Sequence, residues 1–242
     1  MHAICHVVVA ATLAVGLSGC SVYEDMTTSD FAQQDAAAVV AAASKAMQDV
    51  TSMRLTGQVR SQGEQVFVDL KMTRDGRCTG SIRVSGNDVD IRRVGDRAWM
   101  RGSPGALQRL SSTRLPAGVL RSPGRPWVAV KDTAVVALCD LESFLSRLKV
   151  IDYGTNSKKS KRDGDIPASV SEESERNGQD VVELTGSPGG LYDELSVVRS
   201  EAPHYVVQVE SSSAQDGASI SFSEFNDDLE VQQPPVKEIF RS

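Results

Sequence analysis

The sequence predicts an α+β fold in which amphipathic helices pack on an antiparallel sheet. Between residues 53 and 101, and again from 178 to 225, apolar side chains recur at every second position, with turn residues between the runs. This is the period of half-buried strands. Between residues 36 and 50, and again from 141 to 148, apolar residues recur at helical spacing. Short connections between consecutive strands favour an antiparallel meander.

The N-terminus has the pattern of an export signal. Val7 to Leu17 is an apolar run with the length of a signal-peptide core, shorter than the roughly 20 residues that span a bilayer. It ends in Leu17-Ser18-Gly19-Cys20, which resembles the lipobox of bacterial lipoproteins, although no Lys or Arg precedes the run. The resemblance implies that residues 1–19 are removed and that Cys20 carries acyl chains such as palmitate. The alternative is an ordinary secreted protein that is cut elsewhere, for instance after Ala14-Val15-Gly16.

An acylated Cys20 implies a protein anchored on the extracytoplasmic face of the cell membrane. Each buried methylene contributes about 0.8 kcal/mol, and two or three chains together give a stable anchor. Residues 20–29 are short and polar, which suits a tether to the folded part. Residues 30–235 then form one domain, and 236–242 a C-terminal tail.

The first helix of the domain follows the tether. We expect Asp30 to cap it, since Asp accepts hydrogen bonds from free backbone N–H groups at a helix start. One helical stripe contains Val39, Val40, Ala43, Met47 and Val50, so one face of this helix is predicted to be buried.

The period changes to two after this helix. Turn residues at Gly63, Asp75-Gly76, Gly86-Asn87 and Gly95-Asp96 separate strands at hairpin spacing. The strands after the second turn are expected at 78–84, 89–94 and 97–101. Residues 103–126, rich in Pro and Gly, are predicted to form a covering flap, and Asp140 to cap a second amphipathic helix.

Two cysteines remain once Cys5 leaves with the signal and Cys20 is acylated. In an oxidising compartment Cys78 and Cys139 predict one disulfide, which would pin the second helix to the sheet. Two buried free thiols are the alternative. Metal binding by this pair is disfavoured, because neither residue belongs to a CxxC motif or has a nearby His.

The composition argues against several functions. The net charge of −6 disfavours nucleic acid as the main partner. The mature chain has one histidine, His204, which we expect in an exposed turn, and it has no Gly-x-Ser-x-Gly motif, so a hydrolase is disfavoured. Phosphate-binding glycine loops and metal-ligand patterns are also missing. We therefore expect no covalent chemistry and no cofactor.

Three late segments carry a family resemblance. Gly178 to Thr185, Ala202 to Val209 and Ile220 to Asn226, followed by Pro234-Pro235, resemble the closing strands of actinobacterial LolA-like envelope lipoproteins of the LppX and LprG type. The early helix that leads into Met53 to Gly57 is similar to the opening of that family. The resemblance implies a strongly curved antiparallel sheet, a half-barrel, with helices covering a concave face that can hold acyl chains or lipoglycans.

The ligand implied by the resemblance is an amphiphile. A sixteen-carbon chain moved into water exposes apolar surface worth about 12 kcal/mol, so a carrier needs an aliphatic cavity. The candidate lining residues are Val39, Val40, Met47, Val66, Val68, Leu70, Ile82, Val84, Val89, Ile91 and Met100. The alternative is a structural or signalling surface lipoprotein in which the same residues form a closed core and the partner is a protein.

Overall fold

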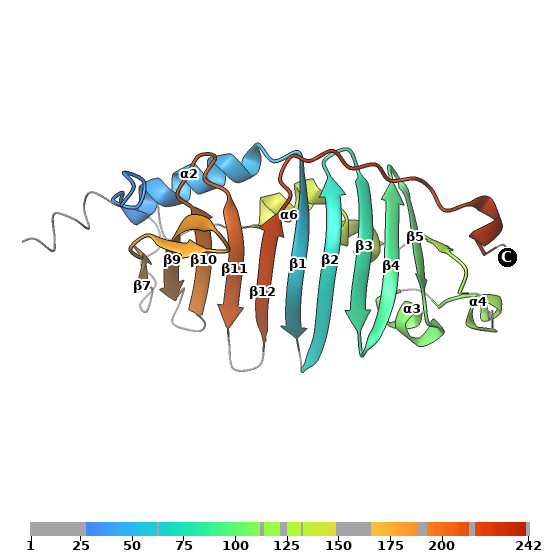
Figure 1. Ribbon diagram of the computed structural model, residues 1–242. Helices are drawn as coiled ribbons and strands as arrows, with labels where there is room; N and C mark the ends of the chain where they lie inside the picture. Colours follow the sequence, from blue (N-terminus) through green and yellow to red (C-terminus); the bar gives the residue numbers. More distant parts are fainter. Residues whose placement is uncertain are drawn as a thin grey trace, which may run out of the picture.

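One antiparallel sheet of twelve strands organises the part of the chain that the structure describes (Figure 1). The structure is a computed structural model, and it describes residues 28–61, 63–111, 114–121, 125–131, 133–148, 166–187, 193–212 and 216–240. The sheet is strongly curved and does not close on itself, with β6 and β7 at its two edges. This is the half-barrel implied by the resemblance.

The first half of the sheet is the predicted meander. Its strands are β1 (Ser52–Ser61), β2 (Glu64–Thr73), β3 (Arg77–Val84), β4 (Asn87–Val94) and β5 (Arg97–Gly102), and β6 (Val128–Val130) pairs with β5 at the edge. Each strand pairs with the next along the chain.

The second half follows the helical middle section of the chain. Its strands are β7 (Ile166–Val170), β8 (Ser174–Arg176), β9 (Gln179–Ser187), β10 (Asp193–Arg199), β11 (Val206–Ser212) and β12 (Gly217–Ser223). β12 pairs with β1, and Leu55 lies opposite Phe222. This pairing joins the two halves into one continuous sheet, and β8 pairs with β9 beside it.

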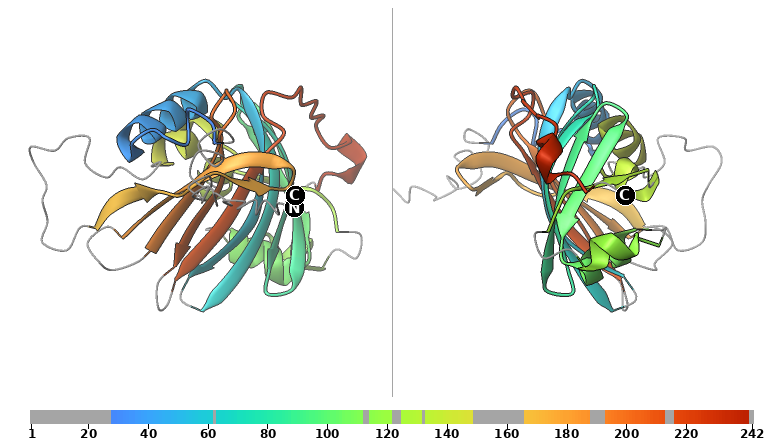
Figure 2. Two further views of the ribbon diagram at one scale, coloured as in Figure 1. Left: turned by 60° about the vertical axis from the view of Figure 1, so that its left-hand side comes forward. Right: turned by 90° about the vertical axis from the view of Figure 1, so that its right-hand side faces the viewer.

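The helices cover the inner, concave face of the sheet (Figure 2). They are α2 (Ala36–Gln48), α3 (Pro104–Leu110), α4 (Ala117–Arg121), α5 (Thr133–Leu138) and α6 (Leu141–Arg147). Asp140 caps α6 as predicted, accepting a hydrogen bond from the Ser143 amide at 2.9 Å. The expected Asp30 cap is wrong, because α2 begins five residues later, where Asp35 accepts from the Ala38 amide at 2.8 Å.

Two glycines permit strands to pass very close to each other. A Cβ at Gly57 would overlap the carbonyl oxygen of Ser219 on β12, and one at Gly80 would overlap the carbonyl of Asp69 on β2. Only glycine fits such contacts, and interior glycines mark tight bends in curved sheets. Both positions therefore favour the strong curvature.

The end of the chain is docked on the domain. The Trp127 amide donates to the carbonyl of Glu238 at 2.8 Å, and the Phe240 amide donates to the carbonyl of Trp127 at 2.8 Å. The Phe240 ring lies against Gly118 of α4. Residues 236–240, expected as part of a tail, thus add a short segment containing the 3₁₀ turn η2 (Val236–Glu238) beside β6. Within the described ranges, no helix combines the length and apolar character needed to cross a bilayer.

Candidate ligand-binding face

The inner face of the sheet brings the predicted lining residues together. All eleven contact one hydrophobic core between the sheet and the helices. Eight of them are buried: Val39, Met47, Leu70, Ile82, Val84, Val89, Ile91 and Met100. Val40, Val66 and Val68 are only half-buried at the margin of the core. The eight buried side chains belong to one packed core, so the three residues at its margin are the ones in contact with solvent.

The apolar inner face continues beyond the closed core. Strand register places Val59 opposite Val66, and Ile220 opposite both Gly57 and Val209, all on the inner side. We call this set of residues the open inner patch: Val59, Val66, Val68, Val209 and Ile220. Val59 is 36% exposed and the other four are half-buried. Figure 1 shows that α2 and α6 cross the upper part of the sheet. Val59 and Val66 lie near the hairpin that joins the lower ends of β1 and β2, and Val209 and Ile220 lie at the middle of β11 and β12.

Sequence analysis did not identify Val59, Val209 or Ile220 as part of this face. Their alternation with polar neighbours was visible in the sequence. What was missing was the pairing of β12 with β1, which joins strands more than 150 residues apart and brings the two halves of the patch together.

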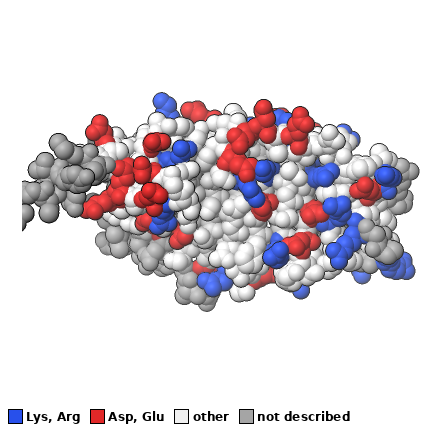
Figure 3. All heavy atoms as spheres, in the orientation of Figure 1, with Lys and Arg blue, Asp and Glu red and all other residues white. Residues whose placement is uncertain are grey.

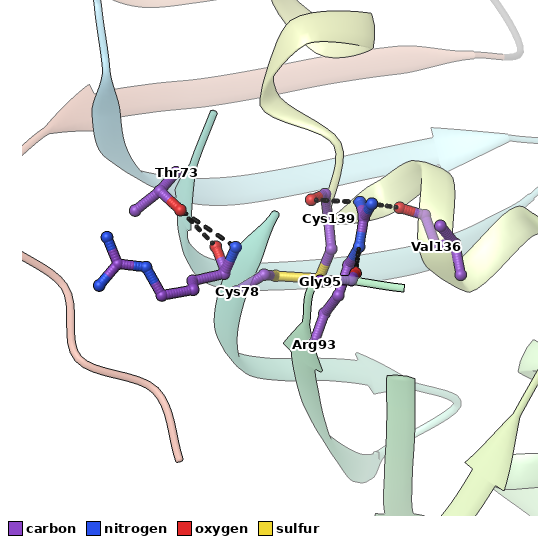
Figure 4. The surroundings of a disulfide bond; sticks show 7 residues. Thr73, Cys78, Arg93, Gly95, Val136 and Cys139 are labelled. Carbon is purple, nitrogen blue, oxygen red and sulfur yellow. Dashed lines mark hydrogen bonds between the residues drawn. A yellow bond between two sulfur atoms is a disulfide. The ribbon is translucent and has the colours of Figure 1, made fainter. Parts of the chain in front are cut away.

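The predicted disulfide is present and joins α5 and α6 to the sheet (Figure 4). Cys78 on β3 bonds Cys139 between the two helices, with 5.6 Å between their Cα atoms. Next to it, the Arg93 guanidinium donates to the carbonyls of Val136 at 3.2 Å and Cys139 at 3.0 Å. A cation that satisfies the free carbonyls at a helix C-terminus stabilises the helix end.

A second arginine ties two helices together at the same end of the sheet. Arg74 follows β2, and its Nε donates to the carbonyl of Val50 at 2.6 Å. Its other nitrogens reach the carbonyl of Gln48, at the end of α2, and the carboxylate of Glu142 in α6. The covalent and charged ties of α2, α5 and α6 described here therefore lie at the upper end of the sheet, away from the open inner patch.

The outer face carries a different, polar surface. Arg54 on β1 bridges Asp69 on β2 at 2.8 Å and Glu224 at 3.0 Å, and Lys71 pairs with the same Glu224. The hydrogen bond from Arg54 lowers the pKa of Asp69 below its ordinary value, and the hydrogen bonds from Lys71 and Arg54 lower that of Glu224. These groups neutralise one another in pairs, which is typical of a stabilising network.

His204 has no catalytic partner among the described residues. Its ring stacks on Phe31 with 3.8 Å between the centroids, and its Nδ1 lies 3.2 Å from the carbonyl of Arg199. The expectation of an exposed turn was wrong, because the ring is half-buried between the N-terminal segment and β10. Within the described ranges, no group of His, Cys, Asp and Glu is arranged to hold a metal ion. Cys20 and residues 1–27 lie outside the described residues.

The fold and the inner face define a class of protein, the open half-barrel with helices packed on its concave side. No protein-family model matches the chain, and no curated protein sequence does. Two solved structures share the fold. LprF from Mycobacterium bovis aligns with a TM-score of 0.52 at 12% identity, over 86% of this chain and 98% of LprF. The Mycobacterium tuberculosis lipoprotein LppX aligns with a TM-score of 0.50 at 12% identity, over 81% of this chain and all of LppX.

Proposed function

We propose that this chain is a lipid-anchored envelope protein that holds the acyl part of an amphiphile against its inner face, without covalent chemistry. The observation that carries the proposal is the open inner patch. Five aliphatic residues from four strands form a surface that continues the core yet remains partly in contact with water. Contiguous exposed apolar surface is unfavourable in a soluble protein and marks sites for apolar ligands or partners.

The arrangement of the helices supports entry of an acyl chain from the patch. Leu145 and Leu148 pack on the margin of the core, near the end of α6 that is remote from the disulfide. Displacing these side chains from the sheet would break neither the Cys78–Cys139 bond nor the contacts of Arg74 and Arg93. The buried valines and methionines beyond them would then surround the deeper part of the bound acyl chain.

The anchor is the second part of the proposal. The run before Cys20 and the lipobox support acylation at that residue, and the fold shared with the lipoprotein LppX agrees with it. Residue 28 is the first that the structure describes, so fewer than ten residues would separate the lipid from the domain. The inner face would therefore work close to the membrane surface.

A closed-core interaction protein is the second candidate, and the burial of eight of the eleven lining residues favours it. The test that separates the two candidates uses the full chain, purified from the envelope of a lipoprotein-exporting host and washed by detergent exchange. Organic extraction followed by mass spectrometry then measures the amphiphile retained per mole of protein. We expect close to one mole for the carrier, while an empty extract from folded protein favours the closed core.

The matched variants are Val66→Gln on the inner face of β2 and Thr56→Gln on the outer face of β1. Both residues are half-buried, and the two side chains lie on opposite faces of the sheet. We expect Val66→Gln to lose most of the bound amphiphile, and Thr56→Gln to retain it. Equal retention by both variants would contradict the assignment of the inner face, provided that both proteins unfold at the same denaturant concentration.

A further inference from the structure

A continuous row of side chains crosses the outer face of the sheet, opposite the proposed lipid site. Strand register places these residues next to one another in the order Thr185, Leu195, Glu210, Ser219, Gln58 and Phe67. Neighbouring strands are about 4.8 Å apart, close to the length of one pyranose ring in an extended polysaccharide. The row thus repeats at the spacing of a sugar chain.

Phe67 is the unusual member of this row. Its side chain is 42% exposed, while its neighbours on the outer side of β2 are the polar residues Gln65 and Asp69. It is the one aromatic residue among the exposed large hydrophobic side chains in the described ranges. Phe67 therefore presents a flat apolar surface to water among polar neighbours. Such a ring can stack on a ligand while the polar side chains beside it form hydrogen bonds.

The outer surface is hollowed on both sides of this ring. One hollow, of about 620 Å³, is lined by Gln58, Arg60, Gln65, Thr185, Glu210 and Ser219 among others. A second, of about 630 Å³, includes Phe67 itself together with Gln65 and Arg83. Gln65 lines both, and its amide donates to the side chain of Gln58 at 2.5 Å. The two hollows therefore meet beside Phe67.

The lining has the chemistry of a site for an uncharged, hydroxyl-rich ligand. Amides and hydroxyls can each donate and accept hydrogen bonds, as sugar hydroxyls do. The hollow of about 620 Å³ combines Arg60 with Glu210, so it has no excess of positive charge to attract a polyanion. Figure 3 shows this face: charged side chains gather at its left end, along its top and on its right, and the middle of the face is largely uncharged.

We propose that the outer face binds a neutral polysaccharide chain, with Phe67 stacking on one sugar ring and Gln58, Gln65 and Ser219 hydrogen-bonding its neighbours. This site is separate from the proposed lipid site, since Phe67 and Val68 point to opposite faces of β2. The proposed envelope location supplies the source of such a chain. Binding itself does not depend on whether a lipid is carried.

The experiment titrates the full chain in detergent with chitohexaose, cellohexaose and α-1,6-mannohexaose, using calorimetry and saturation-transfer NMR. We expect at least one neutral hexasaccharide to bind, with at least a tenfold loss of affinity in Phe67→Ala and a several-fold loss in Gln58→Ala. Leu138→Ala is the matched control, because Leu138 is also 42% exposed but lies on α5. We expect it to bind as the wild type does.

Two results would overturn the proposal. They are no binding of any of the three sugars at millimolar concentration, and equal affinity of Phe67→Ala and Leu138→Ala. Lipid extraction from the same protein samples keeps the two proposals apart. Sugar binding by a lipid-free protein would support this site and contradict the lipid-carrier proposal. A lipid-loaded protein that binds no sugar would support the lipid carrier and contradict this site.

Discussion

The disulfide between Cys78 and Cys139 gives the most quantitative prediction. The bond closes a loop with a sequence separation of 61 residues. In the chain-entropy model, opening such a loop restores freedom to the unfolded chain and lowers the free energy of unfolding by about 4 kcal/mol. For a domain of this size, 1 kcal/mol corresponds to roughly 2–4 °C, so reduction should lower Tm by roughly 8–16 °C.

The assay is urea denaturation of the wild type with and without reductant, followed by circular dichroism. Reduction isolates the loop contribution, because the two sulfur atoms stay in the core, where both cysteines are fully buried. The double variant Cys78→Ala/Cys139→Ala also removes packed atoms and should lose about 1–3 kcal/mol more. In the reduced protein, limited proteolysis should cut α5 and α6 first. A loss below about 1 kcal/mol on reduction would refute the reasoning, and would mean that the arginine contacts alone hold the helices.

Three further predictions concern the hydrogen bonds of Arg74, the close strand contact at Gly57 and the ion pair of Asp69. Arg74→Ala should lower the free energy of unfolding by about 1–3 kcal/mol, since charged hydrogen bonds to Val50 and Gln48 are lost; an unchanged urea midpoint would contradict this. Gly57→Ala should destabilise by about 2 kcal/mol or more, because its Cβ overlaps Ser219, whereas Gly105→Ala, with open space in α3, should be neutral or stabilising. Asp69 has a lowered pKa, so its contribution is present above its unfolded pKa of about 3.9 and is lost as pH falls through the folded value. Asp69→Asn should therefore lose a few tenths to 1 kcal/mol at pH 7, discounted for a side chain that is 48% exposed, and progressively less as the pH falls below about 3.9. An equal loss at pH 7 and at pH 2 would count against the pairing with Arg54.

Local sequence patterns predicted the elements of the first half of the fold well. The turn residues located the hairpins of β1 to β5 to within two residues, because the φ angles that tight turns need are available to few residue types. The Asp140 cap and the cysteine pair were confirmed for similar reasons of local or covalent chemistry. The start of α2 was misplaced by several residues, because Asp30 and Asp35 are both able to cap and only the packed structure selects Asp35.

The site was less predictable, because it depends on pairings far apart in the sequence. Alternation shows that Val59 and Ile220 each face one side of a strand, but not that β1 and β12 are neighbours. It also cannot distinguish a fully covered residue such as Val89 from a marginal one such as Val68, since coverage depends on where the helices end. Phe67 alternates with the buried residues of β2, and its exposure becomes meaningful once the hollows beside it are known.

The distribution of strong contacts decides where this half-barrel can open. At the upper end, opening would have to break a covalent bond, the contacts of Arg93 with two carbonyls and those of Arg74 with α2 and α6. At the lower end, the margin of the core is held by aliphatic packing, and each buried methylene contributes only about 0.8 kcal/mol. An entering acyl chain replaces that packing with equivalent apolar contact. Separation of α6 from the sheet is therefore least costly toward the open inner patch, which is the route that the proposed carrier function would use.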